Sequence, residues 1–182
     1  NMSRVVVGFD SRIQSQKFAQ IVAKIFLLND FQVYVFDEPN PLPELVFALQ
    51  HVNADFGIEI TASHNDKRFN GYKIITKTGA PPNNSEKKEI SQCILESRNQ
   101  SSIKKISLHS DSYSLSENEN LIQLHNFSKN NIDKFDIGKL YIQKLKKSIF
   151  NKNLLDKHAS NIKLGYSSLH GTGFNITSAL FD

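Results

Sequence analysis

The sequence predicts a three-layer α/β/α sandwich with a mixed, mainly parallel sheet, and two observations lead to that fold class. Residues 5–7 are three consecutive valines, and such a β-branched run without alternation is typical of a strand covered on both faces. Strand and helix patterns then alternate along the first half of the chain in the order β-α-β-α-β-β-α. Strands are expected at Arg4–Phe9, Gln32–Phe36, Phe56–Thr61 and Tyr72–Thr76, the last at an antiparallel edge.

Helices are expected between these strands, because apolar residues recur there at spacings of three and four. The first spans Ser15–Leu28, and the second begins at Pro43 after a proline-rich turn. The third runs from Ser85 to about Ser97, with Ser85 as the N-cap and Lys88 where Glu would complete a capping box. The buried face of the first helix is expected to carry Phe18, Ile21, Val22 and Ile25.

The chain changes character after the third helix. Residues 98–131 are rich in Ser, Asn and charge, and their apolar residues are widely spaced. This composition predicts a linker or an ordered polar excursion, with a short helix at Leu121, Ile122 and Leu124.

Regular patterns return in the last quarter of the chain. A helix is expected over residues 137–150, a new strand over 162–166, and a further helix-like run up to Asp182. We therefore divide the chain into residues 1–135, which form one domain with the polar excursion, and residues 136–182. The second part is expected to hold a connecting helix and the start of a second, incomplete domain.

Composition bounds the function. The net charge is +4, but the basic residues are scattered, so small anionic substrates are favoured over nucleic acid. Cys93 is the single cysteine, which excludes an internal disulfide and favours a reducing compartment; its helical context predicts a packing role. No apolar run is long enough to span a bilayer and no signal peptide is seen, so a soluble, cytoplasmic protein without a membrane partner is expected. The oligomeric state is left open.

The stretch Thr61-Ala62-Ser63-His64-Asn65 joins an apolar strand to a polar turn. In doubly wound α/β proteins reactive groups gather at the carboxyl ends of strands, so Ser63 is expected at that edge. A serine hydroxyl needs a base, a metal or electrostatic help to react. His64 could take part in proton transfer, and Lys73 supplies a cation that could offset phosphoryl charge. A Ser-His pair taken alone is better explained as a surface turn with a solvated basic run.

A second turn, Gly8-Phe9-Asp10-Ser11-Arg12, leaves the first strand at the same expected edge. Arg12 could therefore support the loop that carries Ser63. Asp10 and Arg12 could instead cap or pair for purely structural reasons, and the residues alone do not separate the two interpretations.

The stretch TASHNDKRFNGYK resembles the phosphoserine signature of the α-D-phosphohexomutases, the phosphoglucomutase/phosphomannomutase family, which is usually written TASHNPxxxNGYK. Asp66 stands where the family has Pro, so a looser loop is expected. GFDSR resembles the family's GYDSR, and SSLHGTG at 167–173 resembles the TPLHGTG that opens its second domain. The resemblance runs from Val5 to about Phe174 and favours the phosphoglucomutase-2-like branch.

The resemblance implies that Ser63 carries a phosphoryl group between the 1- and 6- (or 5-) positions of a hexose or pentose phosphate, through a sugar bisphosphate. His64 and Lys73 would share the catalytic role, with Thr61, Asn65 and Arg12 supporting the phosphoserine loop. Mg²⁺ would bind an oxygen of the phosphorylated Ser63, and a sugar bisphosphate would be the activator. The family's DGDxDR metal motif is missing from the 182 residues, so a fragment of a mutase, inactive alone, is expected.

Other functions remain open. The chain could be a non-catalytic domain that binds sugar phosphates or a partner, or an unrelated α/β nucleotide-binding protein, although no GxGxxG pattern is present. The glycine-rich turn after His170 could bind an anion at a helix N-terminus, but a plain tight turn with a structural His170 is favoured.

Overall fold

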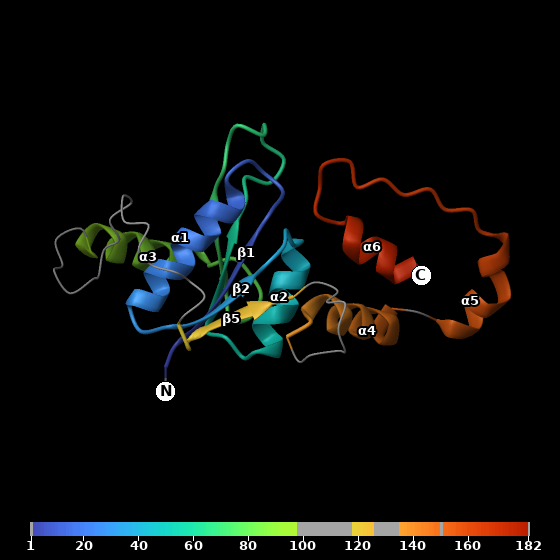
Figure 1. Ribbon diagram of the computed structural model, residues 1–182, viewed down its shortest axis with the longest axis horizontal. Helices are drawn as coiled ribbons and strands as arrows, with labels where there is room; N and C mark the ends of the chain where they lie inside the picture. The colour runs from blue at the N-terminus through green and yellow to red at the C-terminus, as the bar shows by residue number, and fades with distance from the viewer. Residues whose placement is uncertain (1, 98–117, 126–134, 150, 182) are drawn as a thin grey trace.

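The computed structural model describes residues 2–97, 118–125, 135–149 and 151–181. Its centre is a five-stranded sheet with the strand order β4-β3-β1-β2-β5 (Figure 1). Strands β1, β2, β3 and β5 pair in parallel, whereas the edge strand β4 is antiparallel to β3, so the predicted mixed, mainly parallel sheet is confirmed. The strands are β1 Arg4–Phe9, β2 Gln32–Phe36, β3 Phe56–Ile60, β4 Tyr72–Thr76 and β5 Leu121–Leu124.

Helices cover both faces of this sheet, as the sandwich prediction requires. The Phe56 ring of β3 meets the Phe26 ring of α1 at a centroid distance of 5.5 Å, whereas the next residue, Gly57, faces Leu45 and Leu49 of α2. Successive strand residues point to opposite faces, so α1 and α2 lie on opposite sides. The helices are α1 Ser15–Leu28, α2 Leu42–His51, α3 Asn84–Ser97, α4 Ile137–Ile149, α5 Lys152–His158 and α6 Phe174–Phe181, with a 3₁₀ turn at Ala159–Asn161.

The valine run at residues 5–7 is the centre of the core, since all three side chains have 0% exposure. They lie in the central strand β1, with neighbouring strands on both sides and a helix on each face. Burial of one such side chain contributes about 1.5–3 kcal/mol, so these residues carry a large share of the driving force for the sheet. The continuous pattern was therefore a correct indicator of a strand buried on both faces.

The predicted face of α1 was partly wrong. Ala19, Ala23 and Leu27 form its buried stripe, whereas Phe18 and Ile25 are 41% and 38% exposed. Periodicity alone ranked the large side chains first, but small alanines allow the helix backbone to lie close to the sheet. Val22 is only partly buried against the core.

The short helix predicted around residues 121–124 is instead strand β5. Its residues pair in parallel with β2, from Val33 opposite Leu121 to Phe36 opposite Leu124. Leu124 has 0% exposure. The exposed edge of β2 supplies backbone partners that a four-residue helix could not provide for itself, so tertiary pairing decided the structure.

The strand predicted over 162–166 is also not formed. Residues 162–168 are irregular, and Ile162 and Leu164 are 62% and 60% exposed. A strand needs a hydrogen-bonded neighbour, and no described strand runs beside this segment. The division of the chain at residue 135 stays a prediction.

The third helix begins earlier than predicted, and its N-cap is Asn83. The Asn83 side-chain oxygen accepts hydrogen bonds from the amides of Ser85 and Glu86, at 2.8 and 3.1 Å. The Asn83 amide donates to a carboxylate oxygen of Glu86 at 2.7 Å. Asn83 and Glu86 therefore form a complete capping box, two residues before the predicted one. The packing role expected for Cys93 is wrong, because this side chain is exposed on α3.

A buried polar cluster interrupts the core where β1 and β3 end. Glu59 is 2% exposed and Asn40 is 1% exposed. The Asn40 amide nitrogen donates to Glu59 Oε2 at 3.3 Å, and its oxygen accepts from the Phe9 amide at 3.0 Å. Gly8 leaves the room for this cluster, since a Cβ there would lie 2.6 Å from both Asn40 Oδ1 and Glu59 Oε2.

Within the described residues no helix is long and apolar enough to cross a membrane.

Replacement of Asn83 with Ala should remove the N-cap and destabilise the first turn of α3 by about 1 kcal/mol. Amide hydrogen exchange in that turn should then become about five-fold faster, read by NMR. Ser85→Ala is the matched control, because its hydroxyl does not cap the helix. Equal acceleration in both variants would contradict the assignment of the cap.

Burial raises the pKa of Glu59 from its ordinary 4.5 to about 8. Between these values the folded chain holds a proton that the unfolded chain has released, so stability falls as pH rises from 4.5 towards 8. The free energy of unfolding should decrease by up to about 1.4 kcal/mol per pH unit in this window. Urea denaturation of wild type and Glu59→Gln across it should show a flatter dependence in the variant; identical slopes would exclude Glu59 as the cause.

Candidate active site

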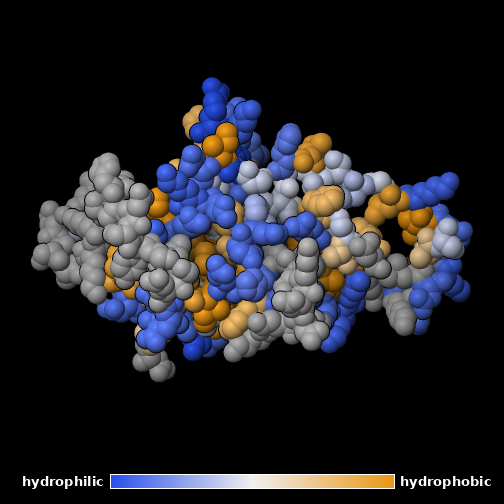
Figure 2. Space-filling view, viewed as in Figure 1, coloured by the Kyte–Doolittle hydropathy of each residue, from blue (hydrophilic) through white to orange (hydrophobic). Residues whose placement is uncertain are grey.

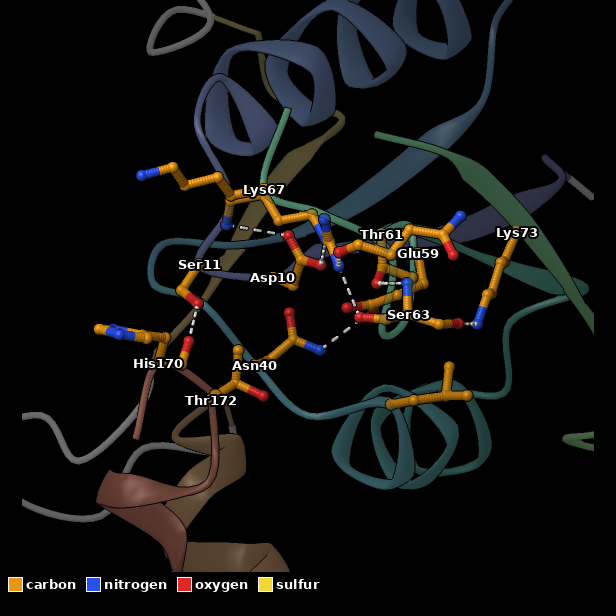
Figure 3. Close-up of a pocket in the computed structure, with 14 residues that line it drawn as sticks. Asp10, Ser11, Asn40, Glu59, Thr61, Ser63, Lys67, Lys73, His170 and Thr172 are labelled. Carbon is orange, nitrogen blue, oxygen red and sulfur yellow. Dashed lines mark hydrogen bonds and ion pairs between the residues drawn. The ribbon is translucent and has the colours of Figure 1, made fainter. Parts of the chain in front are cut away.

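A cavity of about 530 Å³ opens where the parallel strands end at their carboxyl edge (Figure 3). Its walls come from the turn after β1, the turn before α2, the end of β3, the start of β4 and the turn before α6. Segments far apart in sequence therefore meet there, as expected for the edge at which α/β sheets bind ligands. The loop between β3 and β4 rises above this edge, and Figure 2 shows its tip as mainly hydrophilic.

Ser63 and Lys73 are brought together as the sequence predicted. The β3–β4 hairpin pairs Glu59 with Lys73, which places Lys73 near the sheet edge, and its amine donates a hydrogen bond to Ser63 Oγ. Ser63 has a left-handed backbone with φ of 56°, unusual for a residue with a side chain. The Thr61 hydroxyl accepts the Ser63 amide hydrogen bond at 2.9 Å and so helps to hold this conformation.

Arg12 reaches across from the β1–α1 turn and holds the Ser63 loop by its main chain. Its guanidinium donates to carbonyl oxygens spread over the whole loop. They belong to Ser63 (2.6 Å), Asn65 (2.7 Å), Asp66 (2.8 Å) and Phe69 (3.2 Å). A planar guanidinium can satisfy several oxygens at once, so one side chain connects both halves of the loop.

Asp10 orients that arginine. Its carboxylate accepts from Arg12 Nε and from the Arg12 amide, both at 3.0 Å, and the two side chains are only 17% and 10% exposed. Oδ1 also accepts from the Ser15 hydroxyl at 2.7 Å, and Ser15 Oγ in turn accepts from Asn70 Nδ2 at 2.9 Å. Sequence reasoning left the pairing of Asp10 and Arg12 open, and the structure shows that they pair while Arg12 also contacts the loop.

Gly71 closes the loop by a close backbone approach. Its carbonyl accepts from the Thr61 amide at 3.0 Å, and its own amide donates to Asn70 Oδ1 at 2.8 Å. A Cβ at this position would lie 2.4 Å from the Thr61 carbonyl oxygen. The glycine before Tyr72 is thus required for the hairpin to bring Lys73 back toward Ser63.

Asp66 shapes the turn at the position where the family signature has proline, and the looser loop expected from this exchange stays a prediction. Its Oδ1 accepts hydrogen bonds from the Arg68 amide at 3.0 Å and from Arg68 Nε at 2.8 Å. The amide of Phe69 donates to the Asp66 carbonyl at 3.0 Å. The two bonds from Arg68 stabilise the ionised carboxylate, the one from its amide most, and hold the pKa of Asp66 below its usual value. Hydrogen bonds of Asp66 therefore hold this part of the loop.

The other predicted site residues take different positions. Asn65 lines the cavity and offers its carbonyl to Arg12, whereas His64 is exposed and does not belong to the described lining. Its role in proton transfer stays a prediction. His170 lies in the turn that does line the cavity, with Gly171 and Thr172, and its carbonyl accepts a hydrogen bond from the Ser11 hydroxyl. The structural role that we favoured for this turn stays a prediction.

Sequence reasoning missed two residues of the cavity, Asn40 and Glu59. A signal existed for Glu59, because a carboxylate inside the otherwise buried strand Phe-Gly-Ile-Glu-Ile needs a compensating partner. Asn40 stands between two prolines in a turn, and nothing in that pattern indicates a buried amide.

The predicted metal role of Ser63 has only partial support in this chain. Ser63 Oγ is accessible at the cavity and could present one phosphate oxygen once phosphorylated. In residues 2–97, 118–125, 135–149 and 151–181, no group of three or more His, Cys, Asp or Glu side chains could hold a metal ion. These residues alone therefore do not form a complete Mg²⁺ site.

The known proteins to which this chain is similar include several whose names describe sugar-phosphate enzymes. The chain is 33% identical to human glucose 1,6-bisphosphate synthase over 182 residues, which is 97% of this chain and 27% of that protein. It is 29% identical to human phosphopentomutase over 187 residues, again 97% and 27%, and 45% identical to a Staphylococcus epidermidis phosphoglucomutase over 76 residues, 42% and 14%. The chain thus spans about a quarter of the length of the relatives that it matches throughout.

Solved structures agree with the fold. A putative phosphomannomutase from Thermus thermophilus superposes with a TM-score of 0.57 at 26% identity, covering 85% of this chain and 29% of that one. Pp63/parafusin, a phosphoglucomutase from Paramecium, superposes with a TM-score of 0.66 over 100% of this chain and 34% of its own; at 19% identity this likeness supports the fold alone.

Residues 1–101 match the family described as phosphoglucomutase/phosphomannomutase, alpha/beta/alpha domain I. That match covers more than half of the chain. It includes the turn after β1 and the loop that carries Ser63, which meet at the cavity. The chain therefore belongs to the phosphoglucomutase/phosphomannomutase family and contains its alpha/beta/alpha domain I.

Proposed function

We propose that this chain carries the phosphoserine of a phosphohexomutase, with Ser63 as the residue that accepts and returns the phosphoryl group. The observation that carries the proposal is the hydrogen bond from the Lys73 amine to Ser63 Oγ, at the mouth of a cavity where parallel strands end. A cation in hydrogen-bond contact with Ser63 Oγ offsets the negative charge of a phosphoryl group that is transferred to this oxygen. Membership of the family supports the reaction type.

In the proposed step the sugar–phosphate P–O bond breaks and a bond forms between phosphorus and Ser63 Oγ. The hydroxyl proton of Ser63 ends on the sugar oxygen, so the products are a phosphoserine and a sugar hydroxyl. The donor in this step is a sugar bisphosphate. In the step before it, phosphorylated Ser63 gives its phosphoryl group to the free hydroxyl at the other end of a sugar monophosphate: the P–O bond to Ser63 breaks, a P–O bond to the sugar oxygen forms, and the proton of that hydroxyl ends on Ser63 Oγ. Arg12 holds the main chain of the loop, so Ser63 stays at the cavity during both steps.

The substrate class that we propose is a hexose or pentose phosphate, within a phosphoglucomutase-2-like branch. Its support is similarity to a glucose 1,6-bisphosphate synthase and a phosphopentomutase over 97% of this chain. The cavity fits a charged ligand, because Arg12, Lys67 and Lys73 line it. A sugar bisphosphate would then be the donor that first phosphorylates Ser63.

Mg²⁺ belongs to the proposal only in part. It would supply charge neutralisation at the phosphate of phosphorylated Ser63. Since the described residues hold no acidic cluster to complete its coordination, we assign this chain one ligand position, at Ser63, and no step through the metal.

Incubation of the chain with a hexose 1,6-bisphosphate should add the mass of one phosphoryl group, placed on Ser63 by peptide mass spectrometry. Ser63→Ala should abolish this addition, because Ser63 carries the hydroxyl to which Lys73 donates its hydrogen bond. Ser91→Ala, in the exposed part of α3, is the matched control. Binding of the bisphosphate without transfer would favour the alternative of a non-catalytic sugar-phosphate domain.

Replacement of Arg12 with Lys should keep the charge but lose the fork that holds four carbonyl oxygens of the loop. We expect the rate of Ser63 phosphorylation to fall by about 100-fold, because Ser63 is no longer held in place. The control is Arg68→Lys, since the Arg68 side chain is 78% exposed and its ion pair among the described residues is with Asp66. A similar rate in wild type and Arg12→Lys would show that the loop does not depend on this contact.

A further inference from the structure

Glu59 is a buried carboxyl group that the proposed reaction leaves without a task. It lies at the end of β3 with 2% exposure and lines the same cavity as Ser63 and Lys73 (Figure 3). The residue opposite it across the β3–β4 pair is Lys73 itself, so both side chains leave the same face of the sheet. Packing requirements do not explain a carboxyl group there, because an apolar residue would cost less to bury.

The structure makes room for this carboxyl and holds it. Gly8 has no Cβ, which leaves the space that Glu59 Oε2 occupies, and the Asn40 amide donates to that oxygen at 3.3 Å. Asn40 is fixed in turn by hydrogen bonds in both directions with the main chain of Phe9. Strand β1 and the turn before α2 therefore fix the position of the Glu59 side chain.

Burial, helped by two neighbouring carboxyl groups, favours the neutral form of Glu59. Burial raises the pKa of Glu59 to about 8, a hydrogen bond from Asn40 opposes the rise, Asp10 and Glu44 add to it, and Lys73 lowers it. Near neutral pH the carboxyl is thus mainly protonated and does not cancel the charge of Lys73. The other charged or titratable groups that line the cavity are Arg12, Lys67 and His170.

We propose that Glu59 is a positioning residue that acts through Lys73: it stays protonated when Ser63 is phosphorylated and leaves the whole charge of Lys73 to the phosphate. This inference rests on the proposed phosphorylation of Ser63. An ionised Glu59 would attract Lys73 away from the loop and repel the phosphate. Glu59 therefore keeps its proton while Ser63 carries the phosphoryl group.

Thermodynamic linkage makes the proposal quantitative. If a proton on Glu59 favours the phosphate dianion on Ser63, then the dianion must raise the proton affinity of Glu59 by the same factor. Since two negative charges are added to a cavity of limited dielectric, we expect the titration midpoint of Glu59 to rise by at least about half a pH unit. A carboxyl present only for shape would show no such response.

The test uses the 182-residue chain with phosphoserine installed at position 63 by codon reassignment, beside the unmodified chain. Carbon-13 NMR of labelled glutamate carboxyls should give Glu59 a midpoint near 8 in the unmodified chain and a higher one in the phosphoserine chain. Phosphorus-31 NMR of the phosphoserine should show a second inflection at that higher pH. Glu59→Gln should remove the inflection, whereas Glu44→Gln, which changes another buried carboxyl facing Glu59, should keep it at a lower pH.

Three results would overturn the proposal: a Glu59 midpoint in the ordinary range of carboxyl groups, the same midpoint in both chains, or a second inflection that persists in Glu59→Gln. If Glu59→Gln does not fold, the test is the carbon-13 NMR comparison of the unmodified chain with the phosphoserine chain, both of which keep Glu59. The Glu59 carboxyl signal is then assigned through its backbone. Because phosphoserine is installed directly, a failure of Ser63 to accept phosphate from a sugar bisphosphate would leave this test unchanged.

Discussion

The guanidinium of Arg12 is the contact on which the rest of the site depends. One side chain from the first turn of the fold donates to carbonyl oxygens along the whole loop that carries Ser63, and Asp10 fixes its orientation. A loop of exposed polar residues has little apolar burial to hold it, so hydrogen bonds to its main chain must do so. Removal of that contact would leave Ser63 with a strained backbone and few constraints.

The fold supplies this contact because parallel pairing places the ends of β1 and β3 side by side. Phe9 lies opposite Ile60 in the register, and the Asp10 amide donates to the Ile60 carbonyl at 3.0 Å. The turn with Arg12 and the loop with Ser63 therefore leave the sheet next to each other. The antiparallel β4 then returns at the far side of the loop with Lys73. Two kinds of strand pairing in one sheet thus bring a guanidinium to the Ser63 carbonyl oxygen and an ammonium group to the Ser63 hydroxyl.

The second part of the chain contributes to the same edge. Helix α4 packs beside α2, where the rings of Phe47 and Tyr141 lie 5.3 Å apart, and the turn before α6 reaches the cavity. The Ser11 hydroxyl donates to the His170 carbonyl and connects that turn to the end of β1. The cavity is therefore bounded by both parts into which the sequence was divided, and a ligand there would contact each of them.

The sequence by itself determined the fold class and singled out the loop that carries Ser63. The valine run and the alternation of patterns depend on local burial and spacing, and Ser63 with Lys73 stands in a dense motif, so these features needed no tertiary information. The cap of α3 was also within reach of the sequence, because Asn83 and Glu86 form a local capping box. Only the tertiary structure decided that residues 121–124 form a strand and that Glu59 lies beneath the site. Both depend on a partner that no local pattern contains: an open strand edge, or a neighbouring charge in a buried cavity.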